Sequence, residues 1–305
     1  MITLLVTALF TQQSSTLEVL PFRWERAQRV SIEVVETENK IDFEYGVELK
    51  IFKNAKDGGI TIHRDSFEAT SIAGRVVEKD KYPLQMREWG ARMRHVPNLC
   101  IDGAGKLKYL TRIERSEEAF LKEMTEDREG DEVELTPFQY KPGEDREEWS
   151  ELRREYWQRL SEWWTGLPVT PGTHSVDRKL YLGMPRLKWL DVQVLVEVGE
   201  SFEEHGRQLV RIDTVLRLNE DVLGAESLRY LRFIGANPSE LGPLQDFETF
   251  YRDNATFDRE TWLPTEVHTS RKTRLGMATT RAAWVEIVLD KHHYELDWDL
   301  RESDK

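Results

Sequence analysis

The sequence predicts a mainly β protein of the α+β class, with two antiparallel, curved β-sheet halves and covering helices. Each half is expected to be an open, half-barrel-like meander. Three observations predict this architecture: an unbroken apolar/polar alternation over residues 41–51, the return of that alternation after residue 188, and a long aromatic helical pattern between them, at about residues 144–165. Side chains on a strand project alternately to opposite faces, so alternation indicates strands with one buried face.

The first half is predicted to be a meander of strands joined by short polar turns. In residues 41–51 the apolar face consists of Ile41, Phe43, Tyr45, Val47, Leu49 and Ile51. Residues 30–34 and 60–63 alternate in the same way, and residues 54–59 (NAKDGG) are typical of a turn that accepts positive φ. A short helix is expected within residues 81–96, followed by a strand, a glycine turn and a strand over residues 100–109.

Two helices are predicted in the middle of the chain. Residues 116–126 have a capping serine, Ser116, and an apolar face. The main helix, at about 144–165, begins with several carboxylates and ends before Gly166 and Pro168. Its apolar stripe has helical spacing and is widened by two further tryptophans: Trp149, Leu152, Tyr156, Leu160 and Trp163, with Trp157 and Trp164 beside them. A stripe this wide is expected to cover the open face of a sheet, the alternative being the wall of a ligand cavity.

The second half is predicted to be another set of strands. Residues 189–199 and 209–218 alternate and form a natural hairpin, and residues 247–258, 265–271, 283–289 and 294–300 are also expected to be extended. Residues 225–234 fit a helix or a strand equally well. The predicted organisation is a signal peptide at 1–15, an N-terminal β-half at 16–115, a helical connector at 116–166 and a C-terminal β-half at 167–305.

The N-terminal apolar run Ile2–Phe10 predicts export, to the periplasm or outside the cell. The run is too short to span a bilayer, so no transmembrane span is expected, but it matches the apolar core of a secretory signal. No Lys or Arg precedes the run and no clear cleavage site follows it. The alternative is that it forms the first strand of a cytoplasmic protein.

Composition excludes some classes of function. The 43 basic and 56 acidic residues of the 305-residue chain give a net charge of −13, which disfavours a nucleic-acid partner. The strongest basic stretch, Arg271–Arg274, is expected to be a strand end or a solvated loop. The single cysteine, Cys100, cannot form an internal disulfide and is expected to be a buried apolar residue.

The sequence lacks the local motifs of common chemistries. Gly105-Lys106 is not a phosphate loop, because Cys100 and Leu107 occupy positions that require Gly and Ser or Thr. His292 and His293 are adjacent, so on a strand they would face opposite sides, and both are interpreted as surface residues of an edge strand. His268 and Glu266 share a strand face but form only a second-rank candidate. We therefore predict no catalytic residue, no metal site and no cofactor, while a pair of catalytic carboxylates distant in sequence stays open.

Two segments resemble uncharacterised two-half bacterial envelope proteins, periplasmic or secreted. In those proteins an "LP…V..G" segment opens the second half, as in residues 167–172, and "FD..TG.P" marks a strand–turn–strand, as in residues 257–264. Here Trp262 replaces the expected glycine. In outline the two halves are also similar to LolA-type lipoprotein carriers, which implies a periplasmic location and a hydrophobic ligand.

These patterns lead to three hypotheses about function. The first is a non-enzymatic cell-envelope protein that binds a hydrophobic or lipid ligand on a concave sheet face. The second is a structural or protein-interaction module without a small ligand, and the third is a hydrolase with dispersed catalytic residues. The oligomeric state stays open. For the first hypothesis the expected cavity wall consists of Trp149, Tyr156, Trp157, Leu160, Trp163 and Trp164.

Overall fold

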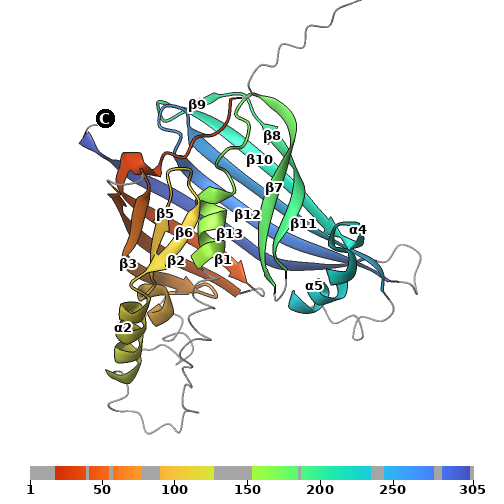
Figure 1. Ribbon diagram of the computed structural model, residues 1–305, viewed down its shortest axis with the longest axis horizontal. Helices are drawn as coiled ribbons and strands as arrows, with labels where there is room; N and C mark the ends of the chain where they lie inside the picture. Colours follow the sequence, from red (N-terminus) through yellow and green to blue (C-terminus); the bar gives the residue numbers. More distant parts are fainter. Residues whose placement is uncertain are drawn as a thin grey trace, which may run out of the picture.

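The computed structural model describes residues 18–38, 41–54, 58–76, 90–126, 153–184, 187–234, 244–277 and 284–302. These residues form one large, open, antiparallel sheet with short helices, which confirms the predicted mainly β class (Figure 1). The strand order is β6-β5-β3-β2-β1-β13-β12-β11-β10-β8-β7, with the short strands β4 and β9 paired to β3 and β10.

The first six strands come from the N-terminal part of the chain. Their bounds are β1 (Ala27–Glu38), β2 (Ile41–Lys53), β3 (Ile60–Ile72), β4 (Arg75–Val76), β5 (Asn98–Ile101) and β6 (Leu107–Thr111), preceded by a 3-10 turn, η1 (Trp24–Arg26). The predicted alternation holds in β2, where Tyr45, Val47, Leu49 and Ile51 are all buried. Ile41 is exposed because the pattern begins at the end of the strand, beyond the core.

The other seven strands come from the C-terminal part. Their bounds are β7 (Gly172–Met184), β8 (Leu187–Val198), β9 (Phe202–Glu204), β10 (Arg207–Asn219), β11 (Leu244–Asp258), β12 (Pro264–Met277) and β13 (Trp284–Leu300). Strand β13 pairs with β1 from Ala27↔Leu300 to Glu38↔Asp290. This long pairing joins the two predicted halves into one continuous sheet, a long-range contact that a local pattern does not reveal.

The helices are short in the described residues. They are α2 (Ile113–Glu126), α4 (Glu220–Leu223), η4 (Gly224–Glu226) and α5 (Ser227–Phe233), so the ambiguous segment 225–234 is mostly helical. Helix α2 begins one turn before the predicted start. Ser116 therefore lies inside the helix, where its N–H donates to Arg112 O, and does not cap it. Residues 90–94 are helical, and the rest of the helix expected in 81–96 lies mostly outside the described residues.

The main helix is described from residue 153 onward, and residues 144–152 of the prediction lie outside the described residues. Residues 153–157 are α-helical and continue into a π-helical turn, η3 (Gln158–Glu162). Gly166 has a φ of 80°, the left-handed conformation that favours glycine after a helix, as its position predicts. Figure 1 shows this helical segment in front of the sheet, between β6 and β7.

The turn between β11 and β12 contains Trp262, the residue that departs from the envelope-protein pattern. The Asp258 carboxylate accepts hydrogen bonds from the N–H groups of Glu260 and Thr261. Trp262, which stands where that pattern has glycine, adopts a φ of 57°. A non-glycine residue is strained in this region, and here the ring contacts the Arg259 guanidinium at 5.5 Å. The predicted strand–turn–strand is therefore present.

Candidate functional site

The helical segment 153–166 bonds to both edges of the open sheet. At the β6 edge, the Trp157 indole N–H donates to Gly105 O in the β5–β6 turn, at 2.9 Å. At the β7 edge, the Gln158 amide donates to Lys179 O and accepts from Tyr181 N–H, both at 3.2 Å. The Gln158 side chain thus pairs with the backbone of the edge strand, a position that is otherwise open to another strand. The helix closes the gap between the two edges.

The sequence-predicted site residues lie mainly in the core between this helix and the sheet. Trp157, Leu160, Trp163 and Trp164 are buried, Tyr156 is half-buried, and Trp149 lies outside the described residues. Trp157 packs edge-on against Trp24, with ring centroids 4.8 Å apart, and Trp164 packs against Phe257. Trp163 donates its indole N–H to Thr214 Oγ1 and lines both of the cavities described next.

The first cavity has a volume of about 280 Å³ and lies between the helix and the concave face of the sheet. Leu180, Leu182 and Trp163 form part of an apolar wall, together with Tyr181 and Phe233. The remaining lining is polar and comes from the helix and from strands β11 to β13: Glu155, Gln158, Arg159, Tyr251, Asp253, Thr269, Ser270, Arg271 and Asp290, with the backbone of Gly183. The cavity is therefore amphiphilic.

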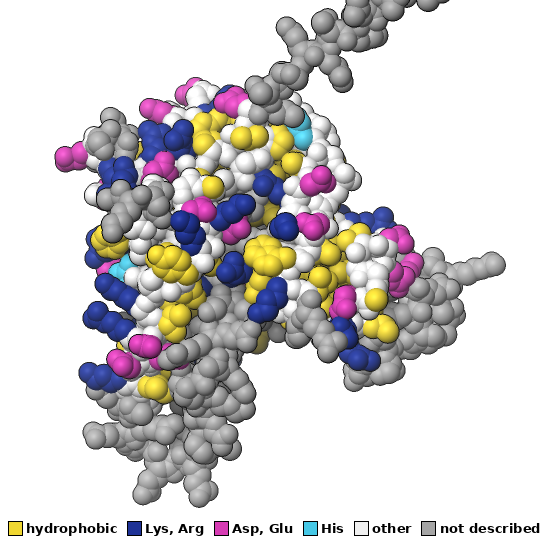
Figure 2. Space-filling model, in the orientation of Figure 1, with side chains coloured by type: hydrophobic (Ala, Val, Ile, Leu, Met, Phe, Trp, Pro, Cys, Tyr) yellow, Lys and Arg dark blue, Asp and Glu magenta, His cyan; other side chains and the backbone are white. Residues whose placement is uncertain are grey.

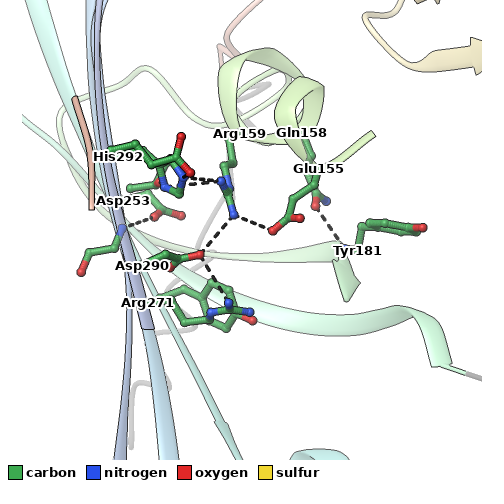
Figure 3. A network of polar contacts seen from close by, with 12 residues as sticks. Glu155, Gln158, Arg159, Tyr181, Asp253, Arg271, Asp290 and His292 are labelled. Atoms are coloured by element: carbon green, nitrogen blue, oxygen red, sulfur yellow. Dashed lines mark hydrogen bonds and ion pairs between the residues drawn. The ribbon is translucent and has the colours of Figure 1, made fainter. Parts of the chain in front are cut away.

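Arg159 is the centre of the polar network in this cavity (Figure 3). One end of its guanidinium contacts Glu155 Oε1 at 2.5 Å and Asp290 Oδ2 at 3.2 Å. The other end lies 2.8 Å from His292 Nε2. Arg271 Nη2 approaches the same Asp290 oxygen at 3.4 Å, so one carboxylate holds two guanidinium groups. Fork-shaped donors fixed in this way are suited to bind carboxylate or phosphate groups.

The network continues toward the N-terminal strands through His292. Its Nε2 atom lies 3.2 Å from Glu36 Oε1, and the Tyr45 hydroxyl donates to the other oxygen of Glu36. Burial pushes the pKa of Glu36 upward, but the hydrogen bond and charge of His292, together with the charge of Arg159, outweigh burial and lower it. Glu36 is thus held as a carboxylate inside the sheet.

Asp253, on β11, is a further carboxyl group of the cavity. Burial raises its pKa from 3.8 to about 7, although the N–H of Ser270 donates to it at 3.2 Å. The nearby Asp290 charge adds to the increase, while Arg159 opposes it. A carboxyl group that is partly protonated near neutral pH can donate as well as accept a proton, which is a property of many functional sites.

Two further arginines are buried beside Tyr156. Arg153 is 3% exposed and Arg64 is 6% exposed, and both guanidinium groups lie near the Tyr156 ring. Arg64 donates to Met93 O, whereas the three guanidinium nitrogens of Arg153 are buried without a hydrogen-bond partner in the described part of the chain. Burial, together with the charge of Arg64, lowers the pKa of Arg153 to about 9. These two groups add positive charge to the interior beside Tyr156.

The second cavity, of about 990 Å³, opens between β6 and β7 on the other side of Gln158 and Trp163. Its lining mixes both charges and a few apolar groups, and includes Lys106, Arg154, Glu162, Asp177, Arg178, Lys179, Trp189 and Asp191. Figure 2 shows acidic and basic side chains interspersed with hydrophobic ones over the face in this view. A lining of mixed charge such as this is typical of a cavity that is filled with water.

Two sequence interpretations near the network are wrong. His292 is not a surface residue of an edge strand: β13 lies between β1 and β12, and His292 is 5% exposed. His292 lies two and four residues before the buried Tyr294 and Leu296, so all three project to the same face of β13. This spacing in the sequence could have identified His292 as a buried residue. Arg271 lies within β12, opposite Asp290 in the register of β12 and β13, and its side chain, which is 21% exposed, contacts the Asp290 carboxylate. The adjacent His293 faces the other side, as predicted.

Comparisons with known proteins identify no family. No protein-family model matches the chain, and no curated protein matches it. One solved structure, titled "Lipid-protein interactions in lipovitellin", aligns with 89% of this chain and 25% of its own, at a TM-score of 0.43 and 8% identity. This chain therefore spans about a quarter of the length of that neighbour. A likeness this weak carries no inference about ligand or activity, and the resemblance to LolA-type carriers stays a prediction.

Among the described residues, no helix is both long enough and apolar enough to cross a membrane.

Proposed function

We propose that this protein is a non-enzymatic binding protein that holds a small amphiphilic molecule with an acidic head group on the concave face of its sheet. The observation that carries this proposal is the two-sided lining of the 280 Å³ cavity, with apolar side chains on β7 and two guanidinium forks opposite. Its volume lies near the lower end of small-molecule pockets, roughly 300–1,000 Å³, which favours a short acyl chain or a compact ring system.

Electrostatics supports an acidic head group. Arg271 and Arg159 already share Asp290, and the buried Nε of Arg271 has no hydrogen-bond partner in the described part of the chain. Arg64 and Arg153 add positive charge behind the helix without a carboxylate partner among the described residues. We expect these two additional guanidinium groups to favour an anion over a cation in an interior where the charges of Arg159 and Arg271 are balanced by Glu155 and Asp290. The apolar part of the ligand would then lie against Leu180, Leu182 and Trp163.

The first test is the content and affinity of the cavity. Native mass spectrometry and solvent extraction of the gently purified chain should reveal a bound acidic amphiphile. In calorimetric titration a short-chain fatty acid, hexanoate, should bind the unliganded protein, and Arg271→Met should weaken that binding by about ten-fold or more, the loss expected for one charged hydrogen bond. Arg211→Met is the matched control, because Arg211 is an exposed arginine paired with Asp213 on β10.

Two results would contradict this proposal. A homogeneous ligand-free mass with a defined dimer, and no binding of the fatty acid, would favour the protein-interaction module. Equal affinity of the Arg271→Met and Arg211→Met variants would place the bound molecule elsewhere.

We propose that the protein acts in the bacterial cell envelope. The support is the apolar run Ile2–Phe10, which lies outside the described residues. N-terminal sequencing of the protein from cell fractions tests this, and an intact Met1 recovered from the cytoplasm would refute it.

A hydrolase is the second candidate, and one specific observation favours it. Asp253, with a pKa of about 7, and Asp290 line the same cavity, and two neighbouring carboxyl groups can serve as general acid and general base. If the protein hydrolyses small esters or glycosides, Asp253→Asn should lower the rate about 100-fold or more. A panel of chromogenic esters and glycosides checks this, with the exposed Asp213→Asn as control. The absence of turnover above buffer in the unmodified protein would reject the hydrolase.

A further inference from the structure

Four side chains with metal-binding atoms form a square on the outer face of β12 and β13. Glu266 and His268 are two residues apart on β12, and His293 and Glu295 are two residues apart on β13. The register pairs Glu266 with Glu295 and His268 with His293. Val267 and Tyr294, which lie between them in sequence, are buried in the core. Because strand side chains alternate, the square lies on the face opposite the Arg159 network.

The side chains of the square already converge. The His268 and His293 rings stack with centroids 4.1 Å apart, at an interplanar angle of 17°. Both Nε2 atoms lie against Glu266 Oε1, at 2.8 and 3.0 Å, and Glu295 Oε1 lies 3.7 Å from His293 Nε2. A zinc ion bound at about 2.0–2.2 Å needs donor atoms roughly 3–3.5 Å apart. The donor spacing is therefore already of the right order, and one of the two partly exposed rings must turn out of the stack to direct both nitrogen lone pairs at a single ion.

The charge pattern around the square favours a cation. Glu266, Glu295 and Glu33 lie side by side in register across β12, β13 and β1. Like charges directly opposite one another destabilise a sheet. The next residue in this row is Gly46 on β2, which is paired with Glu33. The Glu33 carboxylate lies over the backbone of this glycine, because a Cβ added there would be 3.3 Å from Glu33 Oε1. A divalent ion bound at Glu266 and Glu295 would relieve this repulsion.

We propose that Glu266, His268 and His293 bind a divalent transition-metal ion of the Zn²⁺ class, with Glu295 as a fourth ligand. Two imidazoles with carboxylates select such an ion, whereas Ca²⁺ and Mg²⁺ prefer sites made of oxygen atoms alone. The side chains of His268, His293 and Glu266 are 31–40% exposed, which leaves room for a water ligand. This site is independent of the ligand proposed for the concave face.

Calorimetric titration of the full chain with ZnCl₂ tests the proposal. We expect one ion per chain, and an affinity that falls about ten-fold or more in His268→Gln and in His293→Gln. The matched control is His205→Asn, which removes an exposed histidine from the β9–β10 turn, where φ is 50° and asparagine is tolerated. Equal Zn²⁺ affinity in the three variants, or no saturable binding to the unmodified chain, would overturn the proposal.

A second readout separates metal binding from folding. Zn²⁺ should raise the Tm of the unmodified chain and of His205→Asn, because an ion that binds only the folded state stabilises it. In Glu266→Gln the Tm of the metal-free protein should change little, because relief of repulsion in the carboxylate row is offset by weaker contacts with His268 and His293, while the Zn²⁺-dependent increase is lost. A Glu266→Gln variant that binds Zn²⁺ as tightly as the unmodified chain would overturn the ligand assignment.

Discussion

Trp157→Ala is expected to lower the free energy of unfolding by about 3–5 kcal/mol, the range for removing a fully buried large aromatic side chain. Trp157 is completely buried and packs against Trp24 and Phe22. Its indole N–H also bonds to Gly105 O in the β5–β6 turn, so the substitution leaves that carbonyl without its partner. Urea denaturation followed by far-UV circular dichroism measures the loss.

Two control variants separate packing from hydrogen bonding at this position. Trp157→Phe keeps a ring but removes the N–H, and should cost about 1–2 kcal/mol. Trp189→Ala removes a half-buried tryptophan that lines the second cavity and should lower the free energy of unfolding by about 1 kcal/mol. If Trp157→Ala cost no more than Trp189→Ala, the helical segment would not be the element that holds the two sheet edges together.

Asp253→Asn is expected to stabilise the protein at pH 8 by as much as about 4 kcal/mol and to have little effect at pH 4. Burial raises the pKa of Asp253 from 3.8 to about 7. Between these values the folded chain retains a proton that the unfolded chain releases, so this residue lowers the free energy of unfolding as pH rises. A pKa difference of about 3 corresponds to about 4 kcal/mol. Asparagine keeps the acceptor for Ser270 N–H but cannot ionise.

Urea denaturation at intervals from pH 4 to pH 8 measures this effect as the difference between the variant and the unmodified chain. Other titrating groups, such as Glu36, cancel in that difference. Asp213→Asn, an exposed substitution on the neighbouring strand β10, serves as the control and should show a difference that does not change with pH. A pH-independent difference for Asp253→Asn would mean that Asp253 is ionised in the folded chain throughout this range.

The sequence predicted the strands well because each strand carries its own pattern. In β2 the buried residues alternate with partly exposed ones, and in β8 they alternate with exposed ones, as in Val192, Val194, Val196 and Val198. The end of the main helix was also predictable, since Gly166 adopts the left-handed conformation that its position suggested. Those features depend on a few neighbouring residues, and local propensity and periodicity therefore determine them.

The candidate site was not predictable in the same way. Arg159 meets Asp290 and His292 across more than 130 positions, and Asp290 meets Arg271 only because β12 and β13 pair in one register. His268 and Glu266 did share a strand face, as the sequence indicated, but His293 joins them from another strand. Charged residues in strands are usually solvated, so their types alone did not separate the buried ones from the rest.

The sequence by itself determined that this chain is mainly β, where its strands run, and that an aromatic helix would cover a sheet. Only the tertiary structure decided that β1 and β13 join the strands into one sheet, and that the helix links its two edges. It also decided which polar groups are buried. The physical reason is that alternation specifies which face of a strand is apolar, whereas strand order and register depend on contacts between residues far apart in the chain.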